Sequence, residues 1–479
     1  MFFRWLYDEK LAQSSYFLGC EHTGEAIVVD PLRDVEKYIR IAEEKSMEIV
    51  GIAETHIHAD FLSGSRELAE KTGATLYLSE AGGFDEDYLW LNQNQHGGSY
   101  RYQLLDDGDI FSIGTIEFTV LHTPGHSPEH LSFLVKDTGN GALDPIGILT
   151  GDFVLAGDVG RPILADRELQ DQSIAEMYAQ QMFDSLQRFL ELPDFLQVWP
   201  AHGAGSIDAK VPRAIPFSTV GYEKRYNSAV LSLEKPSLFS KNMLMGIPDA
   251  PPYFKRMKRL NREGPPLLVK FPSPEQVDIP TLINHLSSPG IILDTRDWAD
   301  FQKAYLPGAL HTPLKPSFPT VVGSFVLDPG SPIFLIIEPA HLQETITDLI
   351  RIGYDNIVGF ATPQQLQQYF QDGGHYEQVT TLPITQFSKH SSGTSGMLLD
   401  VRRSDEFMEG HLPDAIHIPH TQLAERIEEL PDQEPIFVHC RTEGRSAYAV
   451  SLLKAVGKNA IQLTGGYLAW EEAGREIIR

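Results

Sequence analysis

Cysteine is scarce in this sequence: Cys20 and Cys440 are its only two, and they stand near opposite ends of a 479-residue chain. A disulfide framework is therefore excluded, and both thiols are expected to be reduced. No apolar stretch is long enough to span a bilayer, and the apolar N-terminus meets Asp8 and Glu9 too early for a secretory signal. We therefore expect a cytoplasmic protein that does not enter a membrane.

Positive charge is also in short supply, with 39 basic against 65 acidic residues and a net charge of −26. Such a chain would repel nucleic acid and anionic lipid unless it hid a basic patch, and it contains no basic run. We predict that neither is a partner. The apolar share of 42% and the charged share of 22% are those of a globular protein. The length indicates about three domains.

The second half of the chain contains an internal repeat. LDTRDWADFQKAYLPGALHTP (293–313) and LDVRRSDEFMEGHLPDAIHIP (399–419) are identical at nine of twenty-one positions. Each copy is followed by an apolar strand pattern, PIFLII (332–337) or PIFVHC (435–440), and then by a helical stretch. The pattern predicts two copies of one α/β domain with a parallel sheet. We place these domains at residues 263–375 and 376–479.

The region before the repeat, residues 1–262, alternates short apolar strands with polar turns and amphipathic segments. The spacing of apolar residues predicts helices at 34–45 and 64–73. The strand-rich core reaches about residue 245. The stretch 247–266, rich in proline and basic residues, is interpreted as a linker or as a closing element of this first domain.

Six potential ligands in the first domain follow predicted strands in a fixed order. Any one of these histidines would more commonly be an ordinary core or surface residue. Side chains at the ends of successive strands converge, however, so the ordered set predicts a metal site. The six residues are His56, His58, Asp60, His126, Asp152 and His202.

The order HxHxD, GH, GD, AHG resembles the metallo-β-lactamase fold. This resemblance implies an αββα sandwich with metal between two sheets. The dinuclear zinc hydrolases of that family need a histidine directly after the HxHxD aspartate, where this sequence has Phe61. A phenyl ring cannot ligate a metal, so the dinuclear hydrolase reading is weakened.

The persulfide dioxygenase branch of the same family holds one iron through two histidines and one aspartate, which match His56, His126 and Asp152. That set leaves coordination positions open for persulfide and dioxygen, as in other non-haem Fe(II) oxygenases. We expect one Fe(II) per domain, although zinc also suits these ligands.

The resemblance gives supporting roles to further residues. His58, Asp60 and His202 would orient ligands or water behind the metal. Arg161, in GDVGRP, would hold a substrate carboxylate or the shape of the site, although a surface arginine without a role fits equally well. Tyr222 also resembles the branch and is a substrate-binding candidate.

The second repeat carries the other cysteine. Cys440 lies between a strand and a helix, where backbone N–H groups and the charges of Arg441 and Arg445 would favour a thiolate and cradle a persulfide anion. HCRTEGRS, with LDVR upstream and TGGYLAW downstream, resembles the active-site loop of single-domain rhodaneses.

In the first repeat Ile337 stands at the cysteine position, followed by Glu338. That copy is interpreted as a pseudo-rhodanese that spaces, docks or helps form an interface.

The whole chain resembles persulfide dioxygenase–sulfurtransferase fusions. This resemblance implies oxidation of glutathione persulfide or coenzyme A persulfide by dioxygen to sulfite, with thiosulfate formed at Cys440, in sulfide detoxification. A homo-oligomer, either a dimer or a tetramer, is expected. Two alternatives remain: a zinc thioesterase of the hydroxyacylglutathione hydrolase type, and a non-oxidative sulfur carrier.

Overall fold

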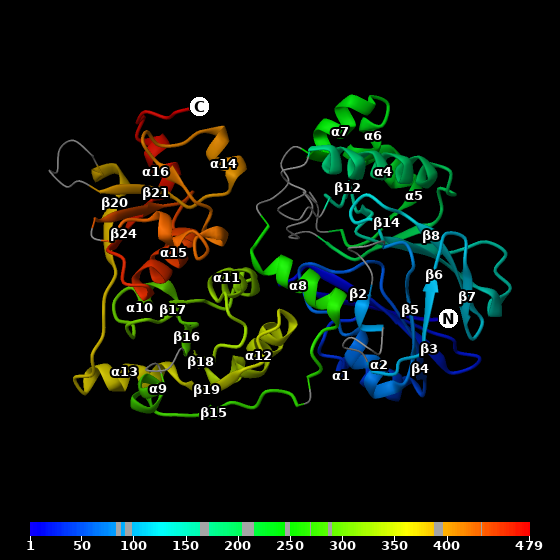
Figure 1. Cartoon of the computed structure of the whole chain (residues 1–479), viewed down its shortest axis with the longest axis horizontal. Helices are drawn as coiled ribbons and strands as arrows, with labels where there is room; N and C mark the ends of the chain where they lie inside the picture. Colours follow the sequence, from blue (N-terminus) through cyan, green and yellow to red (C-terminus); the bar gives the residue numbers. More distant parts are fainter. Residues whose placement is uncertain are drawn as a thin grey trace. The chain divides into compact units, whose positions relative to one another are not determined.

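The computed structural model describes residues 1–82, 88–91, 98–162, 172–203, 215–244, 250–268, 270–285, 290–387, 396–432 and 434–479. The chain divides into two compact units (Figure 1). Unit 1 comprises Met1–Ile247 and Phe254–Val269, and unit 2 comprises Pro248–Tyr253 and Lys270–Arg479. Within the described ranges, no helix is both long and apolar enough to cross a membrane.

Unit 1 is built on two six-stranded sheets, with strand orders β1-β2-β3-β4-β5-β6 and β14-β13-β10-β9-β8-β7. The first contains β1 (Phe2–Asp8), β2 (Gln13–Gly19), β3 (Glu25–Val29), β4 (Glu48–Ala53), β5 (Thr75–Ser79) and β6 (Tyr102–Leu105). The second contains β7 (Ile110–Ile113), β8 (Ile116–His122), β9 (Leu131–Asp137), β10 (Gly147–Gly151), β13 (Gln197–Pro200) and β14 (Ser218–Thr219). A hairpin of β11 (Val154–Leu155) and β12 (Asp158–Val159) follows β10.

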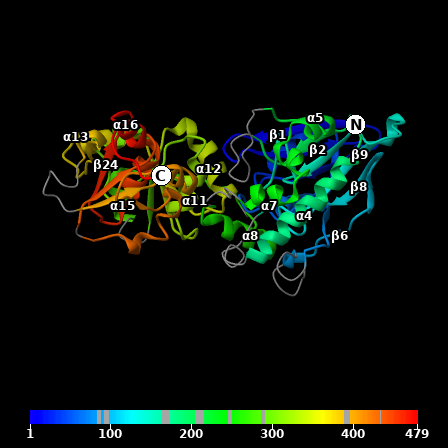
Figure 2. The same cartoon turned by 90° about the horizontal axis from the view of Figure 1, so that it is seen from above.

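The two sheets pack face to face, and helices cover their outer faces (Figures 1 and 2). One apolar cluster, which includes Tyr16, Ile27, Phe118 and Phe133, joins residues of both sheets. A second cluster packs α1 (Glu36–Lys45) and α2 (Ser65–Thr72) on the first sheet. A third packs α4 (Gln172–Leu190), α6 (Ser228–Ser232) and α7 (Pro236–Leu244) on the second. These layers are the αββα sandwich predicted from the sequence.

The two helices predicted at 34–45 and 64–73 are confirmed as α1 and α2. Helix α1 buries Tyr38, Ile41 and Ala42. These residues are three and four positions apart, the spacing that aligns side chains on one helical face. It ends where Ser46 adopts a left-handed conformation, with φ at 54°.

Unit 2 contains two five-stranded sheets with the same topology, β15-β19-β18-β16-β17 and β20-β24-β23-β21-β22. Every strand pairing in both sheets is parallel. The first sheet contains β15 (Glu275–Gln276), β16 (Ile291–Asp294), β17 (Leu310–His311), β18 (Ile333–Ile336) and β19 (Ile357–Ala361). The second contains β20 (Thr380–Pro383), β21 (Met397–Asp400), β22 (Ile416–His417), β23 (Ile436–His439) and β24 (Ala460–Thr464). The internal repeat is therefore two copies of one parallel α/β fold.

Helices connect these parallel strands, because a parallel neighbour requires a crossover connection. In the first copy they are α9 (Ile279–His285), α10 (Trp298–Phe301), α11 (Phe318–Phe325), α12 (Leu342–Arg351) and α13 (Pro363–Gln371). In the second they are α14 (Ser404–Glu409), α15 (Gly444–Ala455) and α16 (Gly466–Glu472).

The stretch interpreted as a linker or closing element contains α8 (Tyr253–Glu263). The end of this helix belongs to unit 1, where Asn261 is 1% exposed. The structure therefore favours the closing element. Residues 247–249 of that stretch lie outside the described part of the chain.

Candidate functional site

Three of the predicted metal ligands meet at the ends of strands that belong to both sheets of unit 1. His56 follows β4, His126 follows β8 and Asp152 follows β10. One ligand atom from each lies within 4.8 Å of the others. The Nε2 atoms of His126 and His56 lie 3.5 and 3.7 Å from the same oxygen, Oδ2 of Asp152. All three side chains are buried.

The chemistry of these donors fits a metal ion. His126 donates its Nδ1–H to the carbonyl oxygen of Arg161 at 2.7 Å, which leaves the lone pair on Nε2. That Nε2 atom is buried without a hydrogen-bond partner among the described residues. Burial lowers the pKa of both His56 and His126, and the neighbouring histidines lower that of His56 further. Both imidazoles are thus held neutral, the form that binds metals.

Asp152 is held ionised and oriented by His202. The Nδ1 atom of His202 lies 2.7 Å from Oδ1 of Asp152, and its Nε2 atom lies 2.9 Å from Oδ2 of Asp60. Burial alone would raise the pKa of Asp152, but the charge and hydrogen bond of His202 hold it below its usual range. Burial works against a charged His202, yet the two carboxylates raise its pKa well above the ordinary value. Both ring nitrogens of His202 therefore contact carboxylates.

The second histidine of the HxHxD motif faces Asp30. The Nε2 atom of His58 lies 3.2 Å from Oδ1 of Asp30, which also accepts a hydrogen bond from the backbone N–H of Thr55 at 2.8 Å. The ring of Phe61 packs 4.4 Å from that of His58. Asp30 was not among the predicted site residues, although its position directly after strand β3 was a usable signal. This side of the site is thus closed by an aspartate–histidine pair and a phenyl ring.

A second residue missed by the sequence prediction, Asn261 of α8, clamps the metal-binding loop. Its Nδ2 atom donates to the carbonyl oxygens of His58 and Phe61, each at 2.7 Å. Its Oδ1 atom accepts from the backbone N–H of Ser63 at 2.9 Å. No local sequence pattern links Asn261 to a loop some two hundred positions earlier, so only the tertiary contact identifies it.

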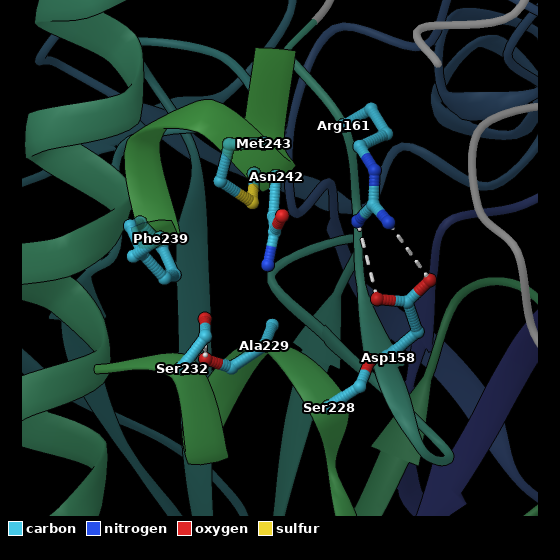
Figure 3. Close-up of a pocket in the computed structure, with 8 residues that line it drawn as sticks. All are labelled: Asp158, Arg161, Ser228, Ala229, Ser232, Phe239, Asn242 and Met243. Carbon is cyan, nitrogen blue, oxygen red and sulfur yellow. Dashed lines mark hydrogen bonds and ion pairs between the residues drawn. The ribbon is translucent and has the colours of Figure 1, made fainter. Parts of the chain in front are cut away.

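Arg161, one of the two substrate-binding candidates, already has a carboxylate partner. Arg161 forms a bidentate ion pair with Asp158, at 3.1 and 3.2 Å. These two side chains line a cavity of about 290 Å³ (Figure 3). The other residues that line it are Ser228, Ala229, Ser232, Phe239, Asn242 and Met243.

This pairing bears on the two roles considered for Arg161. Its guanidinium is already matched by a carboxylate, and its carbonyl oxygen holds His126. Both contacts favour a role in maintaining the shape of the site. Tyr222 lies in α5 (Val220–Tyr226), where its ring is 4.8 Å from that of Tyr226 and its backbone N–H donates to Thr219. A role of Tyr222 in substrate binding stays a prediction.

Cys440 lies between β23 and α15, as the strand and helix patterns predicted. The backbone of the TGGYLAW segment (464–470) holds the loop. The N–H of Tyr467 donates to the Cys440 carbonyl at 2.8 Å, and the N–H of Leu468 donates to the Arg441 carbonyl at 3.1 Å. The Cys440 thiol lies 3.6 Å from the hydroxyl of Ser446. Backbone hydrogen bonds therefore fix the loop just before the helix, and the thiol of Cys440 faces the Ser446 hydroxyl.

The two arginines of the loop are placed differently. Arg445 makes a bidentate ion pair with Glu406 of α14, while Arg441 is exposed. Burial lowers the pKa of Arg445, but the carboxylate of Glu406 raises it overall. Glu406 was not predicted as part of the site. The catalytic roles of Arg441 and Arg445 stay predictions.

The first repeat has no thiol at the matching position. Asp294 pairs with Ile336 across β16 and β18, and Asp400 pairs with His439 across β21 and β23. The next residue along each strand is Ile337 in one copy and Cys440 in the other. Ile337 is fully buried, and a short 3-10 helix, Pro339–His341, occupies the place of the loop.

Two family descriptions match this chain. The metallo-beta-lactamase superfamily matches residues 9–202, and the rhodanese-like domain matches residues 384–473. The region with the metal ligands and the region with Cys440 thus belong to different families. The predicted fold class is confirmed.

Solved structures and curated relatives give further matches. A metallo-beta-lactamase structure from Staphylococcus aureus subsp. aureus COL is 36% identical and covers 76% of this chain and 99% of its own, with a TM-score of 0.66. An ETHE1 structure from Myxococcus xanthus is 26% identical and covers 55% of this chain and 99% of its own, with a TM-score of 0.43.

A hydroxyacylglutathione hydrolase from Tolumonas auensis is 31% identical to this chain over 192 residues, which is 40% of this chain and 62% of that protein. The chain spans less than two thirds of other curated relatives as well, at 65%, 52% and 62% of their lengths. The activity of the whole protein is therefore left to be proposed.

Proposed function

Because the chain joins a metallo-β-lactamase superfamily domain to a C-terminal rhodanese-like domain, we propose that it oxidises a thiol persulfide at one iron and transfers sulfane sulfur through Cys440. One observation carries the proposal: within the described part of the chain, one buried set of two neutral histidines and one aspartate, with Phe61 where a second metal would need a histidine. Two histidines and one carboxylate are the ligands of non-haem iron oxygenases.

The first reaction is R–S–SH + O₂ + H₂O → R–SH + SO₃²⁻ + 2 H⁺. The terminal sulfur is oxidised, its bond to the carrier sulfur breaks, and dioxygen is reduced. Iron bound by His56, His126 and Asp152 would supply the redox chemistry that dioxygen requires. The carrier thiol is glutathione or coenzyme A.

The residues of this chain have defined tasks in that reaction. The Arg161 carbonyl and His202 hold His126 and Asp152 in ligating orientation. Asp30 and Asn261 fix the loop that carries His56. The buried surroundings exclude bulk water from the ligands.

The second reaction uses the sulfite. Cys440 carries a sulfane sulfur, and sulfite takes it: Cys–S–S⁻ + SO₃²⁻ → Cys–S⁻ + S₂O₃²⁻. The S–S bond of the cysteine persulfide breaks, and a new S–S bond forms in thiosulfate. The N–H groups at the start of α15 and the charge of Arg445, which interacts electrostatically with Cys440, would favour the anionic sulfur.

Oxygen uptake tests the first reaction. The protein, purified without oxygen and with its metal content quantified, is given glutathione persulfide in an oxygen electrode. We expect uptake that requires the persulfide, rises in proportion to iron content, and is lost in His126→Ala together with the metal. Uptake that does not depend on iron, or sulfite formed in full without persulfide, would refute the proposal.

A zinc-dependent thioester hydrolase is the second candidate, favoured by the 31% identity with a hydroxyacylglutathione hydrolase. It would use metal-bound hydroxide at the same ligands. This function would be supported if metal analysis found two zinc ions per chain and if the protein hydrolysed a glutathione thioester without oxygen uptake. Phe61 and the commitment of His202 to two carboxylates argue against a second metal.

A further inference from the structure

The cysteine-less repeat packs against the helix that begins at the Cys440 loop. Strand β17 of the first copy lies beside α15 of the second. The backbone N–H of His311 donates to the Ser451 hydroxyl at 3.0 Å, and the Ser317 and Tyr448 hydroxyls lie 3.4 Å apart. These contacts lie within unit 2 and join the two copies of the repeat.

One contact between the two copies connects to the residues around Cys440. Trp298, the first residue of α10, donates its indole N–H to Oε1 of Gln462 at 3.1 Å. Gln462 is fully buried in β24. Its Nε2 atom donates to the carbonyl oxygen of Glu443 and to the hydroxyl of Ser446, each at 3.1 Å. Both acceptors belong to the segment that surrounds Cys440.

The indole selects the orientation of this buried amide. An indole N–H only donates, so the end of Gln462 that faces Trp298 must be its oxygen. The NH₂ end then faces Glu443 and Ser446. The opposite orientation would leave the part-buried indole N–H without its protein partner and set the amide oxygen of the buried Gln462 against the Glu443 carbonyl, and both changes are unfavourable.

The amide orientation controls the group nearest the sulfur. The Ser446 hydroxyl lies 3.6 Å from the Cys440 sulfur and donates to the Glu443 carbonyl at 2.9 Å. The Glu443 carbonyl also accepts from the Gln462 amide and from the backbone N–H of Ala447, so the hydroxyl can turn towards an anionic sulfur without leaving that carbonyl unpaired. The Gln462 amide occupies one lone pair of the Ser446 oxygen and so fixes the directions in which the hydroxyl can point.

We propose that Trp298 of the cysteine-less repeat is a positioning residue for Cys440, acting through Gln462 and Ser446. The first copy thus contributes to the sulfur-transfer site although it has no thiol. The sulfur-transfer part of this inference rests on the proposed function of Cys440, whereas the effect on thiol reactivity does not.

Alkylation of Cys440 by iodoacetamide, followed in the full-length chain by mass spectrometry of the Cys440 peptide, tests the inference. Trp298→Phe keeps an aromatic ring and removes the donor; we expect alkylation about three- to tenfold slower, the effect of losing one part-buried hydrogen bond. Gln462→Leu should slow it at least as much. The double variant should be no slower than Gln462→Leu alone, because both changes break one path.

Ser317→Ala is the matched control, because it removes a polar contact between the same two copies away from the Cys440 loop. Its alkylation rate should stay within about twofold of the wild-type rate, since that contact lies outside the path through Gln462. An equal loss in Ser317→Ala, additive losses in the double variant, or an unchanged rate in Trp298→Phe would each overturn the positioning role.

Sulfur transfer from thiosulfate to cyanide supplies a second readout. In Trp298→Phe we expect kcat to fall by the same factor as alkylation, while KM for thiosulfate stays within about twofold, because the sulfur is mispositioned and the anion site is intact. A change in KM alone would contradict positioning. A wild-type protein that transfers no sulfur would refute the proposed function of Cys440, while the alkylation result would still decide the role of Trp298.

Discussion

The side chains around the metal ligands already contact one another. His202 bridges Asp152 and Asp60, His58 pairs with Asp30, and Phe61 packs on the His58 ring. A second metal would have to break the His202 contacts and find a donor that Phe61 does not offer. We therefore expect one metal ion per chain.

Asn261 gives the first prediction at the residue scale. Asn261→Ala would leave two carbonyl oxygens and one N–H of the metal-binding loop without buried partners. We expect a loss of about 2–4 kcal/mol in the free energy of unfolding, since each buried unpaired group costs about 1–3 kcal/mol and the loop relaxes in part. Metal content after a chelator challenge should fall in parallel. Denaturant unfolding and metal analysis measure the two effects.

Arg259→Ala in the same helix is the control for Asn261→Ala. Arg259 is exposed and pairs with Glu263 at 3.2 Å. Such a surface pair contributes little, so the expected change is below about 0.5 kcal/mol with full metal retention. Equal behaviour of the two variants would show that α8 contributes helix stability only and does not clamp the loop.

At the scale of elements, the shared residues of the repeat are structural. Arg296 and Arg402 each hold the aspartate two positions before them, and each also donates to a carbonyl in the segment that follows, that of Ala304 or Gly410. The motif therefore builds the same strand-to-helix connection in both copies. The presence or absence of a cysteine is independent of it.

Gly466 carries the prediction at this scale. Its φ is +59°, and a Cβ there would collide with the backbone oxygens of Cys440, Arg441 and Thr442. Gly466→Ala should displace the loop, reduce sulfur transfer more than about tenfold, and destabilise the chain by about 2–4 kcal/mol, since overpacking adds to the backbone cost. Thiosulfate–cyanide kinetics and thermal unfolding test both statements.

Gly457→Ala measures the backbone strain of such a substitution without the collision. Gly457 has a comparable φ of +81°, but a Cβ there meets nothing within 4 Å. It should cost only about 1 kcal/mol and leave sulfur transfer intact. Matching losses in the two variants would mean that backbone strain, and not contact with the Cys440 loop, is responsible.

At the scale of the whole molecule, the two proposed reactions belong to different compact units. His56, His126 and Asp152 lie in unit 1 and Cys440 lies in unit 2. The described hydrogen bonds of the metal ligands stay within unit 1, and those of Cys440 stay within unit 2. Substitutions in separate units should have additive and separable effects.

Cys440→Ser should therefore abolish sulfur transfer while persulfide-dependent oxygen uptake stays within about twofold of wild type. His126→Ala should abolish uptake while iodoacetamide still alkylates Cys440 at the wild-type rate. Oxygen electrode traces and mass spectrometry of both variants give the comparison. No oxygen uptake by the wild type, with sulfur transfer that is lost in Cys440→Ser, would instead support the non-oxidative sulfur carrier, in which all chemistry passes through the cysteine.

The sequence by itself determined the fold class, the repeat, and the residues that the structure brings together at the metal-binding position. Those features follow from patterns that are local along the chain: ligands placed directly after strands, apolar residues at strand or helix spacing, and a loop between a strand and a helix. The absence of a thiol in the first repeat was equally visible, because the alignment of two strands places Ile337 opposite Cys440.

Tertiary structure alone decided the supporting contacts. Asn261 meets Ser63 across 198 positions, and Trp298 meets Gln462 across 164. Long-range partners of this kind leave no periodicity and no motif, because their spacing depends on how whole elements pack and not on the chain between them. The same reason separates the roles of Arg161: a sequence shows a cation, whereas only packing shows that Asp158 already neutralises it.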